Sequence, residues 1–296
     1  MAAIDSFYLG AQDFGFVGNE LSRPECVIVE RDGTLWISDD RAAVTRLDPD
    51  GRQTLVGRMK ALPNGLAMDK RGVLYIANIG DGKVYEMQRD GSERVICDSV
   101  DGKPLGSVNF TYIDPAGRLW VTVSTLTEPR INAVQNQIPD GFLFRIDLAT
   151  GRAFKVLDGL YFTNEVRVDA AGAYLYIVET SKGRIIRTPI ATDGSLGPRE
   201  VYGPEPVFPG AKLDGIAFDA EGNLWVTEVG RNSIIVITPA GRAHIVFQDP
   251  EAKLLNRPAS IAFGGPQMRT AYIGSLGMNR LAVFEAPVAG APMVHW

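Results

Sequence analysis

The chain has 296 residues, of which 22% are charged and 45% hydrophobic, and its formal net charge is −5. This balance is typical of a globular protein in water, and an acidic chain argues against a nucleic-acid partner. Two cysteines and two histidines are too few for a disulfide framework or a histidine-rich zinc site. Neither His244 nor His295 lies near a Gly-x-Ser-x-Gly motif, which disfavours a Ser-His-Asp triad. We see no secretory leader and no apolar run of about 18 residues, and therefore expect a cytoplasmic protein without a membrane partner.

One phrase recurs along the chain: an apolar stretch, an acidic residue, two variable residues, Gly, and then Leu, an aromatic and a β-branched residue. Its copies begin at Cys26, Gly65, Phe110, Glu165, Gly215 and, in degenerate form, Ser260. The aromatic positions are Trp36, Tyr75, Trp120, Tyr176, Trp225 and Tyr272, which lie 39 to 56 residues apart. Periods in this range, made of short strands, are typical of propeller blades.

Each copy predicts four strands, separated by turns rich in Gly and Asp. The second copy is typical, with strands expected over residues 65–68, 73–78, 83–88 and 93–98. We therefore predict an all-β fold: one domain over residues 1–296, a six-bladed β-propeller with four-stranded antiparallel blades around a central channel. The last blade needs a fourth strand, which either the tail at 292–296 or the N-terminal segment at 6–10 supplies.

A column of mostly polar residues precedes the first strand of every copy. One residue per blade lies five positions before the acidic position of the phrase: Glu25, Asn64, Asn109, Asn164, Asp214 and Ala259. Because the first strand of a propeller blade is innermost, we expect these side chains to ring the channel at one face. Asn and Asp also favour turns before strands, which is an alternative explanation for single members but not for Glu25.

Carboxylate and amide oxygens are the ligands that hard cations prefer. The column therefore predicts one divalent cation, with Ca²⁺ favoured and Mg²⁺, Mn²⁺, Zn²⁺ or Fe²⁺ as alternatives. The loop between the second and third strands of blade 3, at 124–141, is much longer than its counterparts and opens on the same face. It is either a lid that brings Glu128 or Asn132 over the channel, or a tolerated surface insertion.

In these phrases the sequence resembles the senescence-marker-protein-30/gluconolactonase/luciferin-regenerating-enzyme family. The resemblance is carried by Leu213-Asp214-Gly215 before FDAEGNLWVTE, by Asn109 before DPAGRLW, and by Arg257-Pro258-Ala259-Ser260 before AFGGP. It implies a six-bladed propeller, one divalent cation in the channel, and lactone hydrolysis. The implied ligands are Glu25, Asn164 and Asp214, with Asn109 near both metal and substrate.

Three positions depart from the family pattern. Ser107 and Phe110 stand where sugar lactonases often have Arg and Asp, and Glu165 stands where Gly usually follows the blade-4 Asn. A pocket without that Arg and Asp favours a lactone or ester with fewer hydroxyl groups than an aldonolactone. The substrate-facing candidates are Arg23, Asn64, Ser107, Asn109, Phe110, Glu128 and Glu165.

The resulting hypothesis is a metal-dependent hydrolase that opens a lactone ring, with the cation acting as Lewis acid on the carbonyl oxygen. Asp214 is the candidate general base as well as a ligand, and Glu165 is a second candidate. Two alternatives remain open: another metal-assisted carbonyl reaction, such as an isomerase or lyase, and a non-catalytic propeller that binds a small molecule. Cys26 is expected to point off the channel by strand alternation. The sequence does not indicate an oligomeric state.

Overall fold

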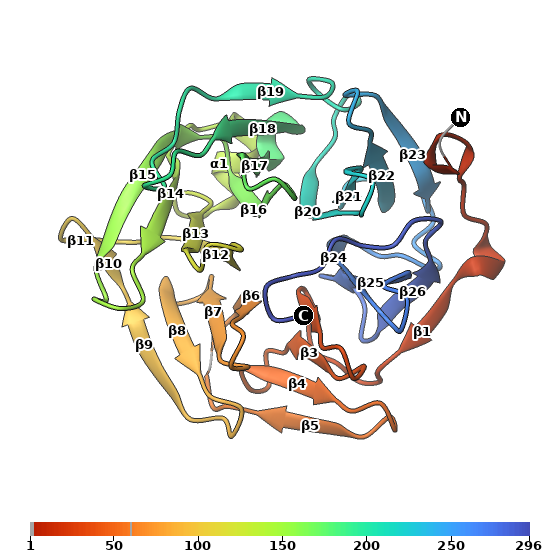
Figure 1. The fold of residues 1–296 in the computed structure, drawn as a ribbon, viewed down its shortest axis with the longest axis horizontal. Coiled ribbons are helices and arrows are strands. Elements are labelled where there is room, and N and C mark those ends of the chain that lie inside the picture. The colour runs from red at the N-terminus through yellow and green to blue at the C-terminus, as the bar shows by residue number, and fades with distance from the viewer. Residues whose placement is uncertain (1–2, 60) are drawn as a thin grey trace.

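Six antiparallel sheets of four strands each stand in a ring around a central axis (Figure 1). The computed structural model describes residues 3–59 and 61–296. Within a blade the chain runs outward from the innermost strand to the peripheral one, in simple up-and-down order. This arrangement confirms the predicted six-bladed propeller.

The first three blades follow the sequence repeat closely. Blade 1 consists of β2 (Val27–Val29), β3 (Leu35–Ser38), β4 (Val44–Leu47) and β5 (Gln53–Val56). Blade 2 consists of β6 (Pro63–Met68), β7 (Leu74–Asn78), β8 (Lys83–Met87) and β9 (Glu93–Cys97), each within two residues of its predicted bounds. Blade 3 consists of β12 (Val108–Ile113), β13 (Leu119–Val123), β14 (Gly141–Ile146) and β15 (Ala153–Leu160). A short hairpin, β10 (Ser99–Val100) and β11 (Lys103–Pro104), precedes it.

The remaining blades and the few helical segments complete the ring. Blade 4 consists of β16 (Thr163–Val168), β17 (Tyr174–Glu179), β18 (Arg184–Pro189) and β19 (Glu200–Tyr202). Blade 5 consists of β20 (Leu213–Phe218), β21 (Leu224–Glu228), β22 (Ser233–Ile237) and β23 (Ala243–Gln248). Blade 6 consists of β24 (Pro258–Gly264), β25 (Thr270–Ser275), β26 (Leu281–Glu285) and β1 (Gly15–Val17). The helical segments are α1 (Ile131–Asn136) and three 3₁₀ turns, η1 (Ala3–Ser6), η2 (Ala11–Asp13) and η3 (Thr180–Lys182).

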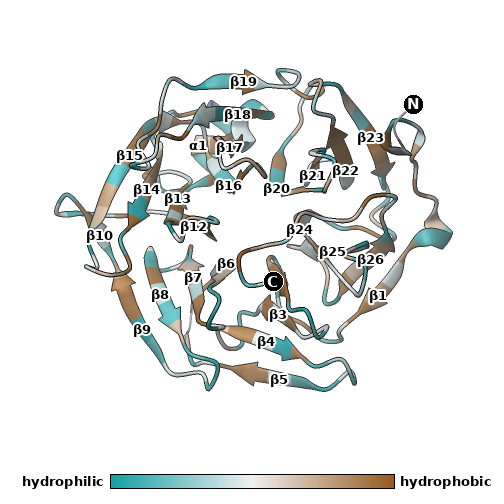
Figure 2. Ribbon diagram, viewed as in Figure 1, coloured by the Kyte–Doolittle hydropathy of each residue, from teal (hydrophilic) through white to brown (hydrophobic). Residues whose placement is uncertain are grey.

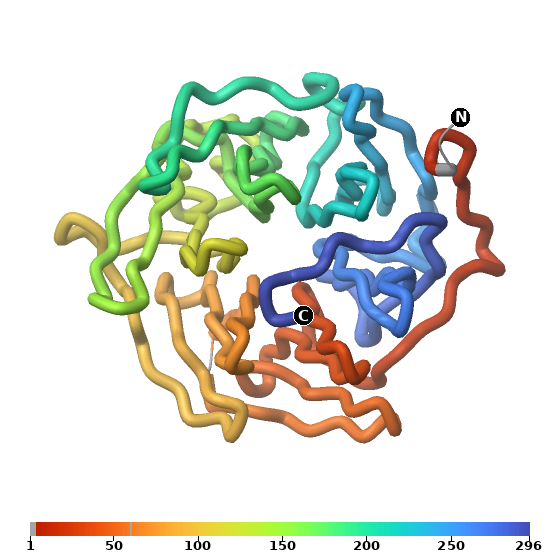
Figure 3. Tube along the Cα trace, in the orientation of Figure 1, coloured from red at the N-terminus to blue at the C-terminus, as the bar shows by residue number. Residues whose placement is uncertain are grey.

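The N-terminal side of the chain closes the ring. β1 pairs antiparallel with β26, with Phe16 opposite Ala282, and Figure 1 shows the red strand beside the blue ones. Of the two predicted sources for this strand, the N-terminal one is therefore correct, but the strand is Gly15–Val17 rather than residues 6–10. The tail does not join the sheet, and runs instead to the middle of the ring (Figure 3).

The repeated acidic residue and the repeated aromatic residue contact each other within a blade. The indole Nε1 of Trp120 donates to Asp114 Oδ2 at 2.9 Å, and that of Trp225 donates to Asp219 Oδ2 at 3.0 Å. Each carboxylate also accepts backbone N–H groups of the intervening turn, as Asp219 does from Asn223 at 2.9 Å. In these blades the repeat therefore specifies a hydrogen bond between the acidic residue after the first strand and the aromatic residue of the second strand, and this bond stabilises the turn between them.

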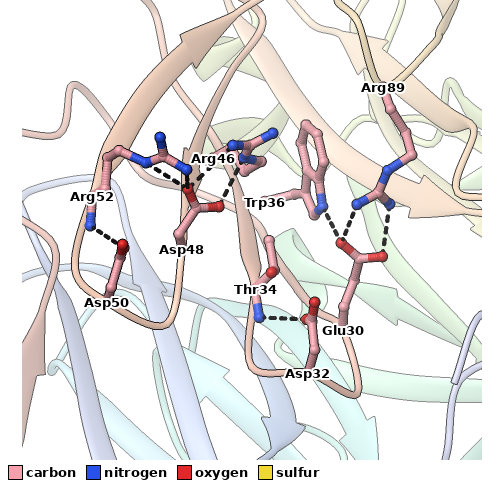
Figure 4. Close-up of polar contacts among 9 residues, drawn as sticks. All are labelled: Glu30, Asp32, Thr34, Trp36, Arg46, Asp48, Asp50, Arg52 and Arg89. Atoms are coloured by element: carbon pink, nitrogen blue, oxygen red, sulfur yellow. Dashed lines mark hydrogen bonds and ion pairs between the residues drawn. The ribbon is translucent and has the colours of Figure 1, made fainter.

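In blade 1 the same bond extends to the next blade (Figure 4). Trp36 Nε1 donates to Glu30 Oε2 at 2.7 Å, and the Arg89 guanidinium of blade 2 donates to both Glu30 oxygens, at 2.7 and 3.0 Å. Arg89 also lies over the Trp36 ring, 5.1 Å from its centroid. A bidentate, stacked arginine of this kind links two neighbouring blades, because it joins the turn after β8 to the turn after β2.

Burial decreases from the axis outward. The innermost strands β6, β12, β16 and β20 are buried along their whole length, whereas β5 and β9 at the periphery have exposed residues. Figure 2 shows hydrophobic segments in the strands of every blade. Apolar contact between neighbouring sheets therefore holds the blades together, and the innermost strands provide the rigid wall of the channel.

The Trp225 bond predicts a specific pattern of stability losses. Trp225 is fully buried and packs edge-to-face with Phe7 and Phe263. We expect Trp225→Ala to lower the free energy of unfolding by about 3–5 kcal/mol through lost packing. Trp225→Phe keeps most of that packing but removes the indole N–H that donates to Asp219. It should lower the free energy of unfolding by about 1–3 kcal/mol. Urea unfolding measures both, with Tyr8→Ala at a 64% exposed position as a control that changes stability by less than about 0.5 kcal/mol. A Trp225→Phe variant as stable as the wild type would contradict the structural role of the indole bond.

Candidate functional site

The six residues of the predicted column meet at one end of the channel. Five begin or lie within innermost strands and one precedes β2; in blade order they are Glu25, Asn64, Asn109, Asn164, Asp214 and Ala259. Each is 5% exposed or less. Direct bonds join neighbouring blades, since Asn64 Nδ2 donates to Glu25 Oε1 at 2.8 Å and to the Asn109 carbonyl oxygen at 2.9 Å. The structure thus brings the predicted column together.

A β-bulge interrupts the innermost strand at the column in five of the six blades. The register against the second strand shifts between Pro63 and Leu66, Val108 and Phe110, Thr163 and Val166, Leu213 and Ile216, and Pro258 and Ser260. A bulge leaves residues unpaired and re-aims their side chains. The close approach of blades also requires glycine after two column residues, because a Cβ on Gly65 would lie 2.3 Å from the Phe110 ring.

Arg23 and Asn64 orient the Glu25 carboxylate. Arg23 Nη2 donates to Asn64 Oδ1 at 2.7 Å, which fixes the direction of the Asn64 amide. The amide nitrogen then donates to Glu25 Oε1 and leaves Glu25 Oε2 without a hydrogen-bond partner. The sequence placed both residues near substrate; in the structure they also hold a column carboxylate in one orientation.

Four column side chains each bury one oxygen atom that has no hydrogen-bond partner. These atoms are Glu25 Oε2, Asn109 Oδ1, Asn164 Oδ1 and Asp214 Oδ1. Buried polar atoms are nearly always bonded, so four on one ring are suited to a shared partner such as a cation or ordered water. All four are hard oxygen donors and two are carboxylates, which is the donor set of a Ca²⁺-like cation. The residues therefore fit a divalent cation.

The carboxylates of the ring are in an unfavourable environment for negative charge. Burial raises the pKa of Glu25 to about 8, against the opposing effect of Arg23. Burial and the charges of Glu25 and Glu165 raise the pKa of Asp214 well above its ordinary value. Across residues 3–59 and 61–296, no three His, Cys, Asp or Glu side chains form a metal-binding group. A cation here therefore depends on the asparagine oxygens as well.

Glu165 lies in the channel wall but is already bonded. Its Oε2 pairs with Arg167 at 2.8 Å and accepts the backbone N–H of Ile216 from blade 5 at 3.2 Å. Arg167 in turn stacks over Phe110, 4.8 Å from the ring centroid. Burial raises the pKa of Glu165 to about 7. The structure thus places Glu165 and Phe110 in a layer beneath the column, and sequence reasoning missed Arg167, whose only signal was a second charge within an inner strand.

The far end of the channel is closed by the C-terminal tail. Ala291 N donates to the Phe218 carbonyl oxygen at 2.8 Å, and a His295 ring nitrogen lies 3.0 Å from that of Val29. Between tail and column lies a partly open cavity lined by innermost strands and by the tail, with Cys26, Val27 and Ile28 among the lining residues. The Cys26 Sγ accepts the backbone N–H of Leu66 in blade 2 at 3.3 Å, so the thiol packs against the neighbouring blade.

The long blade-3 loop is held at its base and against blade 4. Asp140 accepts the hydroxyls of Thr125 and Thr127, at 2.6 and 2.7 Å, and closes the base of the loop. Gln137 Nε2 donates to the Ser181 carbonyl oxygen of blade 4 at 3.1 Å. Across the ring, the positive charge of Arg23 in blade 1 contributes to lowering the pKa of Arg130, after the larger effect of burial. The loop therefore reaches from blade 4 toward blade 1.

Two other predicted residues lie at the base and outside of this loop. Ser107 is buried, and its backbone bonds to Ser124 and Thr125 where the loop begins. Glu128 is exposed and lines a cleft of about 580 Å³ with Asp81 and Gly106, between blades 2 and 3. The structure therefore does not bring Glu128 to the column. No helix within residues 3–59 or 61–296 has the length and apolarity needed to span a membrane.

Comparison with known proteins identifies related sequences and folds. The SMP-30/Gluconolactonase/LRE-like region matches residues 23–277. The chain is 30% identical over 197 residues to the 6-deoxy-6-sulfogluconolactonase of Pseudomonas putida, an alignment that covers 66% of this chain and 63% of that relative. Two solved structures share the fold. A gluconolactonase from Xanthomonas campestris has a TM-score of 0.77 at 19% identity, with 97% and 94% of the two chains covered. Regucalcin from Agrobacterium tumefaciens strain C58, a calcium-binding protein, has a TM-score of 0.77 at 18% identity, with 94% and 96% covered.

The unpartnered oxygens predict opposite effects of one substitution with and without a cation. In metal-free buffer at a pH high enough to ionise Asp214, Asp214→Asn removes a buried charge, and the resulting gain of about 1 kcal/mol in the free energy of unfolding would raise Tm by about 2–4 °C. Added Ca²⁺ should stabilise the wild type by about 2.7 kcal/mol at a hundredfold excess over Kd, and the variant far less. Differential scanning calorimetry measures both effects. Asp90→Asn, the same change in an exposed turn, is the control and should follow the wild type. A variant that gains as much from Ca²⁺ as the wild type would contradict a cation at the column.

Proposed function

Because the chain belongs to the SMP-30/gluconolactonase/LRE-like family, we propose that it is a metal-dependent hydrolase that opens lactone rings. The observation that carries the proposal is the set of four unpartnered oxygens, on Glu25, Asn109, Asn164 and Asp214, at one end of the ring of innermost strands. A cation held by such oxygens can polarise a carbonyl group and activate water, which is the chemistry that lactone hydrolysis needs. The lactonase names of the relatives support the same reaction.

Glu25, Asn164 and Asp214 would hold the cation, with Asn109 beside it. When bound, this cation would supply Lewis-acid stabilisation of the negative charge that develops on the lactone carbonyl oxygen. Ca²⁺ suits an all-oxygen donor set with two carboxylates, and the shared fold with calcium-binding regucalcin supports this choice. The alternatives are the other divalent cations that accept oxygen ligands.

The chain's own groups would then handle positioning and the proton. Asp214 would accept the proton of the attacking water as that water adds to the carbonyl carbon. Collapse of the tetrahedral adduct breaks the ring C–O bond, the ring oxygen takes the proton back from Asp214 to become a hydroxyl, and the carboxylic acid product then releases a proton to solvent. Asn109 orients the substrate by its amide, and the buried wall keeps other water away.

The departures at Ser107, Phe110 and Glu165 bear on which lactone is opened. Phe110 is buried under Arg167, and the Glu165 carboxylate is bonded to Arg167 and Ile216. None of the three offers the charged donors and acceptors that bind several sugar hydroxyls. We therefore expect a lactone or ester that is less hydroxylated than an aldonolactone. The same departures keep a second candidate, another cation-assisted carbonyl reaction on this scaffold.

Proton release in a pH-indicator assay against a lactone panel tests the proposal. We expect the Ca²⁺-supplemented wild type to open at least one lactone, and Asp214→Ala to lose at least about 100-fold in kcat, the scale of one acid–base group. Asp90→Asn controls for the loss of a negative charge and should keep full activity. The panel should include γ-butyrolactone and glucono-δ-lactone.

Each contrary result has a separate meaning. A cation that binds without any lactone being opened would overturn the hydrolase and leave the second candidate. Equal activity of Asp214→Ala and wild type would remove Asp214 from the mechanism. Sub-millimolar KM for glucono-δ-lactone would contradict the expected preference for fewer hydroxyl groups.

A further inference from the structure

Asp214 lies in a β-bulge whose backbone is held by side chains rather than by the neighbouring strand. β20 pairs with β21 at Leu213 and again at Ile216, and the register shifts between these two pairs, where Asp214 and Gly215 lie. A bulge frees backbone N–H groups from the ladder, and buried N–H groups need acceptors. The groups that accept these N–H bonds therefore set the direction in which the Asp214 side chain points.

Two side chains accept the N–H groups of the two residues that follow Asp214. Gly215 N donates to Thr227 Oγ1 of β21 at 2.8 Å, and the Thr227 hydroxyl lies 3.4 Å from the Gly215 carbonyl oxygen. Ile216 N donates to Glu165 Oε2 of β16 at 3.2 Å. Both acceptor residues are buried, so bulk water does not compete for either bond. The bulge is thus fixed from its own blade and from blade 4.

Arg167 holds the Glu165 carboxylate in place. Its Nη2 pairs with the same Oε2 atom at 2.8 Å, and its Nη1 donates to the Val166 carbonyl oxygen at 2.8 Å. The guanidinium also lies over two blade-3 rings, 4.8 Å from the centroid of Phe110 and 5.3 Å from that of Tyr112. A guanidinium that is bonded and stacked in this way has little freedom to move. Glu165 Oε2 is therefore kept within reach of blade 5.

Blade 2 contains a bond of the same kind. The N–H of Leu66, two residues after the column residue of that blade, donates to Cys26 Sγ of blade 1 at 3.3 Å. In both cases the acceptor directly follows the column residue of the preceding blade and reaches the bulge of the next blade. Sulfur is a weak acceptor, whereas the Glu165 carboxylate is a strong one. The stronger bond is therefore at the blade that carries Asp214.

From these contacts we infer that Glu165 and Thr227 are positioning residues, which orient the Asp214 carboxyl group in advance for the cation and for the attacking water. The inference deepens the proposed function and rests on it, because Asp214 is the ligand and the base proposed there. A ligand that is already oriented loses less conformational freedom on binding, and the site binds more tightly for that reason. Arg167 contributes by fixing Glu165. The usual glycine at position 165 would have no side chain to accept the Ile216 N–H.

Thr227→Val tests the inference without changing any charge. The substitution keeps the branched shape of the side chain and removes the oxygen that accepts the Gly215 N–H. We expect the Kd for Ca²⁺ in titration calorimetry to rise about 10-fold, the scale of one buried N–H left without its acceptor. Thr122→Val is the matched control, because Thr122 has the corresponding place in β13 but its hydroxyl has no hydrogen-bond partner among the described residues. The control should change Kd by less than about 2-fold, and equal Kd values for both variants would overturn the role of Thr227.

Two double variants with the net charge of the wild type test Glu165. Arg167→Met is combined with Glu165→Gln in one and with Glu165→Leu in the other, so both lack the ion pair and only the first keeps an oxygen for the Ile216 N–H. We expect the leucine variant to bind Ca²⁺ about 10-fold more weakly than the glutamine variant. A Glu165 that acts only through its charge would give both the same Kd, and this result would overturn its positioning role. If urea unfolding shows that the leucine variant is not folded, Glu165→Ala in the same background takes its place.

Calorimetry and the lactone assay together separate this inference from the proposed function. If Thr227→Val and the leucine variant bind Ca²⁺ more weakly but no lactone is opened, the positioning roles stand and the hydrolase falls. If lactones are opened and these variants keep the Kd and kcat of the wild type, the hydrolase stands and the positioning roles fall. If both stand, Thr227→Val at saturating Ca²⁺ should lose about 10-fold in kcat with little change in KM. A wild type that binds no divalent cation would overturn both.

Discussion

Pairing of β1 with β26 closes the ring, and the site exists only because the ring is closed. Each innermost strand is buried on both sides by its neighbours in the circle, so six strand starts converge on one axis. Without the N-terminal strand, blade 6 would expose the edge of β26 and the circle would have a gap. Closure therefore fixes the spacing of side chains that lie as much as 189 residues apart in sequence, from Glu25 to Asp214.

Convergence on the axis also buries carboxylates and unpaired oxygen atoms close together, which is electrostatically unfavourable. In five of the six blades a bulge lies at the column residue, and hydrogen bonding satisfies only part of the polar atoms that meet there. Asn64 satisfies one Glu25 oxygen, Arg167 and Ile216 satisfy Glu165, and four oxygens are left over. A fold stabilised by its apolar blades tolerates this local cost, which is a usual feature of sites that bind ions and perform chemistry. The same oxygens that destabilise the protein alone are the ones a hard cation needs.

The two ends of the channel differ in kind. The C-terminal tail covers one end through bonds to backbone carbonyl oxygens of blades 1 and 5, and the space between tail and column has a mostly apolar wall. The other end carries the polar column, and the blade-3 loop is anchored beside it on blade 4.

The sequence by itself determined the blade count, the strands within each blade and the membership of the column. These features follow from a local repeat, because the Asp–Trp bond, the turns and the alternation of strands all lie within one copy. Only the tertiary structure decided which segment closes the ring, since residues 15–17 and the tail have similar local patterns and differ only in which partner is within reach. It also decided that Glu165 is paired with Arg167 and that the Cys26 thiol accepts a backbone N–H from the neighbouring blade. Those relations depend on bulges and on contacts between blades, and no spacing within a repeat specifies where two blades bring their side chains together.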